Sequence, residues 1–188
     1  MKHFTTLCTL LLSLSAISQE TTRPLTKRII VKTNVLSLIA QRPTVTIEKV
    51  FTKTFSTEIS FVQGEFNNFL FTDHYEYQGF LLRAKKYIIN VDFGKISPYG
   101  AFYIGNLMRT ILTTGQVDNS GYWGYPSRNF YANSIRGGFS LGIAYFSKRK
   151  INIDGLMSLG YGMYRKADRE NFNGYLDLQV WLSVGYCF

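Results

Sequence analysis

The final stretch of the chain, residues 175–188, alternates between apolar and mixed side chains at every second position. Because successive side chains of a β-strand point to opposite faces, this pattern predicts a strand with one apolar face. A strand that crosses a bilayer needs such a face over about 9–11 tilted residues. The apolar positions are Leu176, Leu178, Val180, Leu182, Val184, Tyr186 and Phe188. The stretch therefore predicts a membrane-crossing strand against which the rest of the chain closes as a sheet.

The N-terminus has the pattern of a signal peptide. It combines a basic start at Lys2, an apolar run over residues 7–17 and a small-x-small cleavage site over residues 16–18. The run is too short for a membrane-spanning helix, and Cys8 lies inside it, which argues against a lipoprotein anchor. We therefore expect a signal peptide over residues 1–18, a periplasmic tail over 19–27 and the barrel domain over 28–188.

The charge of the chain is strongly basic, with 21 Lys and Arg against 12 Asp and Glu. Cleavage of the leader would remove only Lys2, so 20 basic residues would remain against 12 acidic ones, a net charge of +8. Export disfavours a nucleic-acid partner, and we expect contacts with outer-membrane lipid, lipopolysaccharide or a surface polysaccharide instead. Cys187 would be the remaining cysteine, so no internal disulfide is expected. A buried filler is a better interpretation of Cys187 than a reactive thiol.

The region after the leader lacks any apolar run near the 18 residues of a spanning helix. Only helices and closed barrels satisfy their backbone groups in lipid, so a membrane protein of this composition has to be a barrel. Aromatic residues make up 16% of the chain and can form interfacial girdles. The alternating segments that predict strands are 28–36, 44–51, 55–63, 79–89, 98–108, 134–146, 151–164 and 175–188.

Eight strands predict an all-β fold, an eight-stranded antiparallel up-and-down transmembrane β-barrel in the outer membrane. Short turns of such barrels face the periplasm and longer loops face outward. The longer connections here are residues 64–78, 110–133 and 165–174. Both termini are then expected in the periplasm. The strand at 98–108 is apolar on both faces, and its facing stays open.

The hairpin formed by residues 44–51 and 55–63 offers a test of register. Folding it about Lys53 places three apolar pairs on one face and sets Glu48 opposite Glu58 on the inner face. The apolar pairs are Phe51 with Phe55, Ile47 with Ile59, and Val45 with Phe61. Two carboxylates at that spacing destabilise a sheet unless cations stand between them or one is protonated.

Cations on neighbouring strands are expected to reach these carboxylates. Arg83 and Lys85 would lie at the height of Glu58, Lys32 would reach Glu48 from the other side, and Arg136 would approach across the barrel. The expected lumen charge network is Lys32, Glu48, Glu58, Arg83, Lys85 and Arg136. It could form a gated or selective pore, or a structural plug. Because eight strands leave room for little more than side chains, the plug is the favoured interpretation.

Catalytic and metal chemistry find little support in the sequence. Lipid-modifying hydrolases on eight-stranded barrels need a base within reach of a nucleophile. His74, in an expected loop, is the one histidine outside the leader, and no expected strand carries His with Ser two positions along. His74 and Cys187 lack the spacing of metal ligands. We therefore expect no catalytic residue, no metal and no cofactor.

The expected outer loops carry aromatic and basic side chains that could contact partners. Exposed aromatics could stack on sugars or anchor a protein, although they could also form an interfacial girdle. Basic residues at the outer rim could bind lipopolysaccharide phosphates, unless Asp168 and Glu170 neutralise them. The candidate contacts are Tyr122, Trp123, Tyr125, Arg165, Lys166 and Arg169.

Four segments are similar to those of small outer-membrane barrels: KTNVLS at 32–37, PTVTIE at 43–48, LRAKKY at 82–87 and SPYGAF at 97–102. The chain after the leader as a whole resembles OmpA-type transmembrane barrels, and these four segments carry a narrower resemblance to a barrel family of unknown function common in Bacteroidota. The final GYCF resembles the aromatic signal of the barrel-insertion machinery, with Tyr186 and Phe188 as its aromatic residues. The resemblance implies a fold and a Gram-negative envelope location, without an activity.

The expected function is a non-enzymatic outer-membrane barrel with a structural or surface-interaction role and an interior filled by side chains. Two alternatives remain. The first is a lipid-modifying enzyme of the outer leaflet. The second is a soluble periplasmic barrel that binds an apolar ligand, in which the apolar face of each strand would point inward and the charged face toward water.

Overall fold

The computed structural model of the chain describes residues 28–38, 42–69, 72–112, 116–117, 124–125, 130–167 and 174–188. The expected signal peptide over residues 1–18 and the tail over 19–27 lie outside the described residues. The described part contains no helix that is both long enough and apolar enough to cross a membrane.

Eight antiparallel strands form a closed barrel in the order β1-β10-β9-β8-β5-β4-β3-β2. The first strand pairs with the last, for example Val31 opposite Tyr186, so the ring has no open edge. This confirms the expected all-β, eight-stranded, up-and-down antiparallel architecture. The strands of the ring are β1 (Ile29–Asn34), β2 (Val45–Thr52), β3 (Phe55–Phe69), β4 (Thr72–Tyr87), β5 (Ile96–Leu112), β8 (Phe130–Phe146), β9 (Ile151–Ala167) and β10 (Gly174–Cys187).

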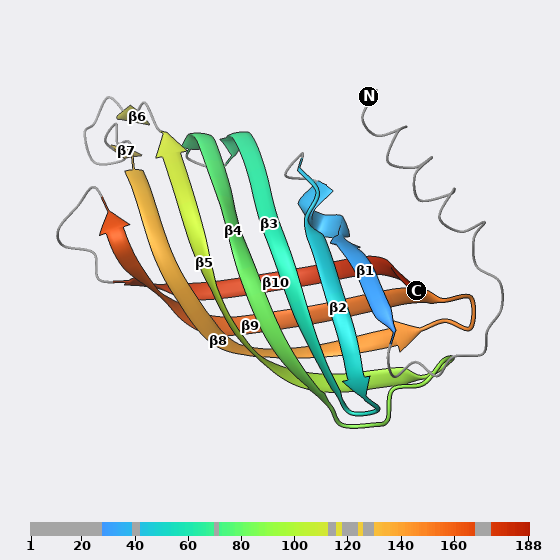
Figure 1. The fold of residues 1–188 in the computed structure, drawn as a ribbon. Helices are drawn as coiled ribbons and strands as arrows, with labels where there is room; N and C mark the ends of the chain where they lie inside the picture. The colour runs from blue at the N-terminus through green and yellow to red at the C-terminus, as the bar shows by residue number, and fades with distance from the viewer. Residues whose placement is uncertain are drawn as a thin grey trace.

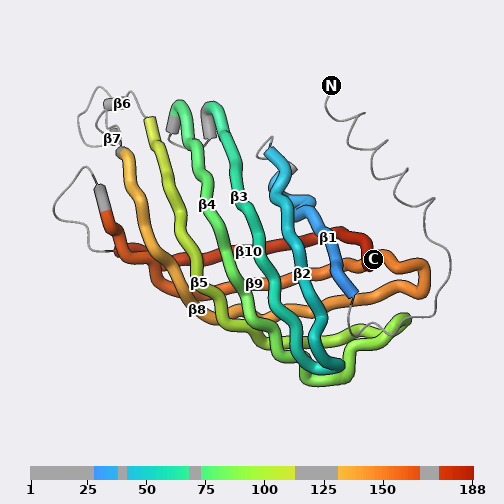
Figure 2. The backbone as a smooth tube through the Cα atoms, in the orientation of Figure 1, coloured from blue at the N-terminus to red at the C-terminus, as the bar shows by residue number. Residues whose placement is uncertain are grey.

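Two small elements accompany the ring. A 3-10 turn, η1 (Val35–Leu38), follows β1, and the strands β6 (Gln116–Val117) and β7 (Gly124–Tyr125) form a separate two-stranded sheet between β5 and β8. Figure 1 shows β2 to β5 crossing in front of β8 to β10 at a steep angle, as the strong tilt of barrel strands requires. Figure 2 shows the β2–β3, β4–β5 and β8–β9 turns at the end of the barrel where the C-terminus lies.

The two faces of the strands differ as the alternation predicts. On β10, Leu178 and Val180 point outward and are exposed, whereas Asp177 and Trp181 point inward and are buried. On β4, Arg83, Lys85 and Tyr87 are buried inside the ring and alternate with exposed neighbours. The facing of β5, which the sequence leaves open, is now defined. Its inward residues are Ser97, Tyr99, Ala101, Tyr103 and Leu107, and its exposed outward residues include Phe102 and Ile104.

The hairpin register agrees with the prediction in its central part. Val45 pairs with Phe61, Ile47 pairs with Ile59, and Glu48 lies opposite Glu58. The predicted pairing of Phe51 with Phe55 is wrong, because an irregularity between residues 50 and 52 sets Thr52 opposite Phe55. The rings of Phe51 and Phe55 still lie near each other, with centroids 6.1 Å apart.

Several expected element limits are wrong. Residues 64–78, expected to be a loop, continue β3 and β4 as a paired hairpin up to Phe69 opposite Thr72. Pairing there satisfies backbone groups that a loop would leave to water, although the side chains lack apolar alternation. The first strand ends at Asn34, before the expected limit, because the Asn34 Oδ1 atom accepts hydrogen bonds from the backbone N–H groups of Leu36 and Leu182.

Candidate functional site

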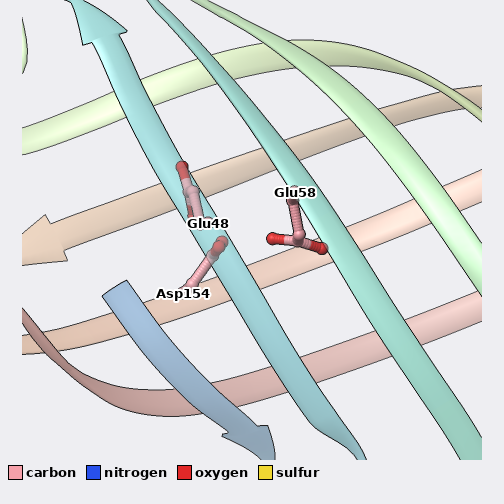
Figure 3. Close-up of side chains that lie close together, drawn as sticks. All are labelled: Glu48, Glu58 and Asp154. Atoms are coloured by element: carbon pink, nitrogen blue, oxygen red, sulfur yellow. The ribbon is translucent and has the colours of Figure 1, made fainter. Parts of the chain in front are cut away.

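The most concentrated chemistry in the described residues is a buried ion-pair cluster inside the ring. Three carboxylates come from three strands, Glu48 on β2, Glu58 on β3 and Asp154 on β9 (Figure 3). The side-chain oxygens that face one another lie within 4.8 Å. Such a group could hold a metal ion in another setting, and it requires cations here.

Lys32 of β1 lies between the three carboxylates. Its Nζ atom is 2.6 Å from Glu48 Oε2, 2.7 Å from Glu58 Oε2 and 2.8 Å from Asp154 Oδ2. An ammonium group has three N–H donors, so these contacts use its full capacity. Lys32 therefore occupies the position between the carboxylates that a metal ion would need.

Lys85 of β4 reaches the same three carboxylates from a second direction. Its Nζ atom lies 2.6 Å from Asp154 Oδ2, 2.8 Å from Glu58 Oε2 and 3.2 Å from Glu48 Oε2. Arg83 adds an Nη1 contact of 2.7 Å to Glu58 Oε1. Three cations thus face three anions, and all six side chains are essentially excluded from solvent. The charges balance locally, which a buried cluster requires.

Hydroxyl groups satisfy the carboxylate oxygens that the lysines do not reach. The Ser56 and Tyr87 hydroxyls donate to Glu48 Oε1 at 2.5 and 2.8 Å. The Tyr99 hydroxyl donates to Asp154 Oδ1 at 2.6 Å. Each carboxylate oxygen of the cluster therefore has a donor, so the cluster has no open position for a substrate or ion.

The six residues of the expected lumen charge network do not form one group. Five of them, Lys32, Glu48, Glu58, Arg83 and Lys85, meet in the cluster. Arg136 belongs to a separate group nearer the long-hairpin end of the barrel. There its Nη1 atom lies 3.4 Å from Asp177 Oδ1. The expected approach of Arg136 to the Glu48 and Glu58 carboxylates is therefore wrong, because Arg136 pairs with Asp177 of β10 instead.

Two further carboxylates of the interior were missed by sequence reasoning. Asp154 and Asp177 both occupy inward positions of their strands, and the alternation of the sequence already places them on the inner face. The alternation alone does not say which cations these two carboxylates meet, since this depends on how the ring closes. An unpaired inward carboxylate facing unpaired inward cations is the signal that could have found them.

A polar chain connects the two groups. The Arg83 Nη2 atom donates to Gln179 Oε1 at 3.1 Å, and its guanidinium lies 4.1 Å above the Trp181 ring. The Gln179 Nε2 atom donates to Asp177 Oδ2 at 2.7 Å, which also accepts from the Tyr103 hydroxyl at 2.8 Å. These contacts extend from the cluster toward the long-hairpin end of the barrel.

The interior below the cluster, toward the short turns, is mainly apolar, although Ser97 and Asn152 are also buried there. Tyr87 packs edge-on against Tyr99 and Phe146, with centroids 5.3 and 6.4 Å away. Cys187 is fully buried in this layer, as expected for a filler. The other residues of the layer include Ile30, Val50 and Val91. The cluster and this layer together fill the described interior from its middle to its short-turn end.

The polar contacts at the long-hairpin end involve residues outside the regular apolar band. Arg42 contacts Glu65 Oε2 at 2.5 Å and Glu76 Oε1 at 2.9 Å. The hydrogen bond with Glu65 raises the pKa of the Arg42 guanidinium above its usual value. The Nδ1 atom of His74 is hydrogen-bonded to Asn67 Oδ1 at 2.8 Å and lies 3.8 Å from Glu65 Oε1. Neither neighbour offers a hydroxyl nucleophile.

The structure describes only some of the expected loop contacts. Tyr122, Trp123 and Arg169 lie outside the described residues. The backbone of Tyr125 belongs to β7 and that of Lys166 to β9, and Arg165 is an exposed residue of β9. In the expected insertion signal, the rings of Tyr186 and Phe188 contact edge-on with centroids 5.0 Å apart.

Comparison with known proteins assigns this chain to a family. A search of curated proteins and a search of solved structures each give no match. One family model, described as "Protein of unknown function (DUF3575)", matches residues 4–175. This match covers most of the barrel as well as the N-terminal region, so the chain belongs to the DUF3575 family of proteins of unknown function.

Proposed function

We propose that this chain is an outer-membrane β-barrel with a non-enzymatic, structural or surface-interaction role and a plugged interior. The observation that carries the proposal is the distribution of side chains between the two faces of the ring. Large apolar side chains point outward and are exposed on all eight strands, while the buried charges lie inside. Lipid is the environment in which this arrangement costs least.

The size of the outer apolar surface supports lipid contact. The largest apolar patch on a typical soluble monomer is about 300–600 Å². Here Phe102, Leu141, Met157 and Leu178 lie on four different strands, with exposed fractions of 73%, 62%, 68% and 67%. Apolar neighbours continue the band around the ring, which favours a membrane over water.

The polar interior speaks against a soluble barrel that binds an apolar ligand. Such a barrel needs an apolar lumen and a polar exterior. In this chain Lys32, Glu58, Arg83, Lys85 and Asp154 fill the middle of the interior instead. Hiding the outer band from water would then require an extensive oligomer, and lipid needs no such partner.

The short-turn end supports an orientation and a lipid partner. Basic residues gather there. The acidic residue Asp92 at this end is already paired with Lys95, whose Nζ atom lies 3.3 Å from Asp92 Oδ2. Anionic phospholipid headgroups would complement this rim. We assign the short turns and both termini to the periplasmic side, with a cleaved leader before residue 19 and the Tyr186 and Phe188 rings available to the insertion machinery. The basic residues near these turns that are exposed or half-buried are Lys49, Lys53, Lys86, Lys95, Lys148, Arg149 and Lys150.

The long-hairpin end is then the outer side, where lipopolysaccharide, a surface polysaccharide or a protein could be contacted. Arg165 near the outer end of β9 is exposed and available to lipopolysaccharide phosphates. An enzymatic role has less support, since the described contacts of His74 supply no nucleophile.

The proposal is tested by membrane fractionation and by gel mobility. The full chain should appear in the outer-membrane fraction, and the unboiled protein should migrate faster than the boiled protein, with a sheet-type circular dichroism spectrum. In a planar bilayer the wild-type barrel should show no steady conductance, because the ion-pair cluster closes the interior. A soluble periplasmic protein with a single mobility would refute the membrane proposal, and steady conductance would refute the plug.

A further inference from the structure

A cavity of about 380 Å³ lies inside the barrel above the ion-pair cluster. Most of its wall comes from the parts of β4, β5, β8 and β10 that lie toward the long hairpins, so it opens away from the short turns. Trp181 and Gln179, which contact Arg83, form its lower part. A cavity of this size can hold a small organic molecule.

Two arginines in the wall have hydrogen-bonding capacity that the barrel does not use. Among the described residues, the Nε atoms of Arg109 and Arg136 are both buried and have no hydrogen-bond partner. Arg136 is only 5% exposed, and its described ion pair is the long 3.4 Å contact with Asp177. A guanidinium has five N–H donors in a fork that matches carboxylate and phosphate oxygens. These two side chains are therefore suited to an oxyanion in the cavity.

The position of Arg109 is fixed by aromatic neighbours. Its guanidinium lies 3.9 Å above the Tyr175 ring and 5.7 Å from the Tyr164 ring, and its Nη2 atom donates to the Tyr164 hydroxyl at 2.9 Å. Tyr175 is held in turn by its hydroxyl contact with Ser134 at 3.1 Å. A guanidinium oriented in this way loses little conformational freedom when it binds an anion.

The carboxylates near the cavity already have cationic or hydrogen-bonding partners. Asp177 accepts from Tyr103 and Gln179 and pairs with Arg136. Glu65 and Glu76 lie on outward-facing positions of β3 and β4, outside the cavity lining, and both are paired with Arg42. These contacts reduce the repulsion that an entering anion would meet.

Aromatic surface makes up much of the remaining wall. Tyr75 and Tyr77 line the cavity with centroids 5.8 Å apart, and Tyr175 and Trp181 complete its aromatic lining. Tyr75 lines the same cavity as Arg109 and Arg136, so the aromatic rings and the cations face one space. Aromatic faces pack against the flat apolar face of a ring, and their polar tips can bond to hydroxyl groups.

We infer that this cavity binds a small ring compound that carries an oxyanion, with sugar acids and sugar phosphates as the matching class. The arginines bind the carboxylate or phosphate, and the tyrosines and Trp181 contact the ring. The inference goes beyond the proposed structural role. It rests on the proposed function only in one respect, namely that the cavity opens to the outer side of the membrane.

Trp181 in the lining provides a direct signal for binding. We would use the full mature chain with Trp123→Phe, so that Trp181 alone reports, and accept only protein whose unboiled gel mobility indicates a closed barrel. The probes are glucuronate, glucose 6-phosphate, glucose and inorganic phosphate. At least one of the two sugar anions should change Trp181 fluorescence saturably and bind at least about tenfold more tightly than glucose or phosphate.

Variants of Arg109 assign the site. Arg109→Gln should weaken sugar-anion binding about tenfold to hundredfold, since hydrogen bonds to a charged group are lost. Arg109→Lys keeps the charge without the fork and should also weaken binding. Arg149→Gln is the matched control, because it makes the same substitution at an exposed turn at the opposite end. It should bind like the parent protein.

Preference for glucuronate would indicate acidic polysaccharide as the source, and preference for glucose 6-phosphate would indicate a phosphorylated glycan. The inference is overturned if no probe binds, if glucose or phosphate binds as tightly as the sugar anions, or if Arg109→Gln and Arg149→Gln behave alike. Because every sample is a verified barrel, a negative result would not reflect failure of the proposed fold or location.

Discussion

Lys32 is the side chain whose removal tests the ion-pair cluster most directly. Lys32→Met keeps an unbranched side chain of similar length but deletes the ammonium that contacts three carboxylates at 2.6, 2.7 and 2.8 Å. The cluster then holds the cations Lys85 and Arg83 against three anions, so its charge changes from zero to −1. Removing one partner of a buried ion pair costs about 3–5 kcal/mol.

That loss is a large share of the roughly 5–15 kcal/mol by which a typical domain is stable. We expect Lys32→Met to lower the free energy of unfolding by about 3–5 kcal/mol. The assay is equilibrium unfolding in detergent micelles, followed by tryptophan fluorescence. The fast-migrating band of unboiled protein gives an independent measure of the folded fraction.

The double variant Lys32→Met with Glu48→Gln separates charge balance from packing. It removes one cation and one anion, so the cluster returns to neutrality, with Lys85 and Arg83 against Glu58 and Asp154. We expect it to be more stable than Lys32→Met by about 0.5–3 kcal/mol, the usual coupling between contacting residues. If Lys32→Met does not fold, the double variant should still restore some fast-migrating band. A loss below about 1 kcal/mol in Lys32→Met, or a double variant no more stable than the single one, would refute the charge-balance argument.

Three further substitutions test separate parts of the barrel. Val180→Lys places a charge on the outer face of β10, where Val180 is 60% exposed, and should cost about 2–4 kcal/mol in lipid. Asn106→Ala removes the Oδ1 atom that accepts the Phe80 N–H at 2.8 Å on the outer surface, and should cost about 1–3 kcal/mol because no water replaces it in lipid. Tyr99→Phe removes the 2.6 Å hydrogen bond to Asp154 Oδ1 inside the ring and should also cost about 1–3 kcal/mol.

All three are measured as unfolding free energies in micelles or lipid vesicles, with the wild-type barrel alongside. In water an exposed substitution such as Val180→Lys changes stability by only about 0.5 kcal/mol. A change that small in a bilayer would contradict the lipid-facing assignment of β10. A neutral Asn106→Ala would mean that the Phe80 N–H has another acceptor, and a neutral Tyr99→Phe would mean that Asp154 does not depend on the hydroxyl.

Much of the barrel follows from local sequence. The period-two alternation of β10 defines which of its side chains point outward, because neighbouring side chains of a strand must point to opposite faces. The β2–β3 turn is short, so it also defines the register that sets Glu48 opposite Glu58. Strand limits were less predictable, since β3 and β4 continue pairing where the apolar alternation has stopped.

The sequence by itself determined the fold class, the faces of most strands and the presence of charges inside. Only the tertiary structure decided which charges meet. Asp154 joins Lys32 and Lys85 across the ring, and Arg136 pairs with Asp177 instead of the carboxylates of the hairpin. Distances across a barrel depend on strand tilt and stagger, which follow from closure of the whole ring and leave no signature in any single strand.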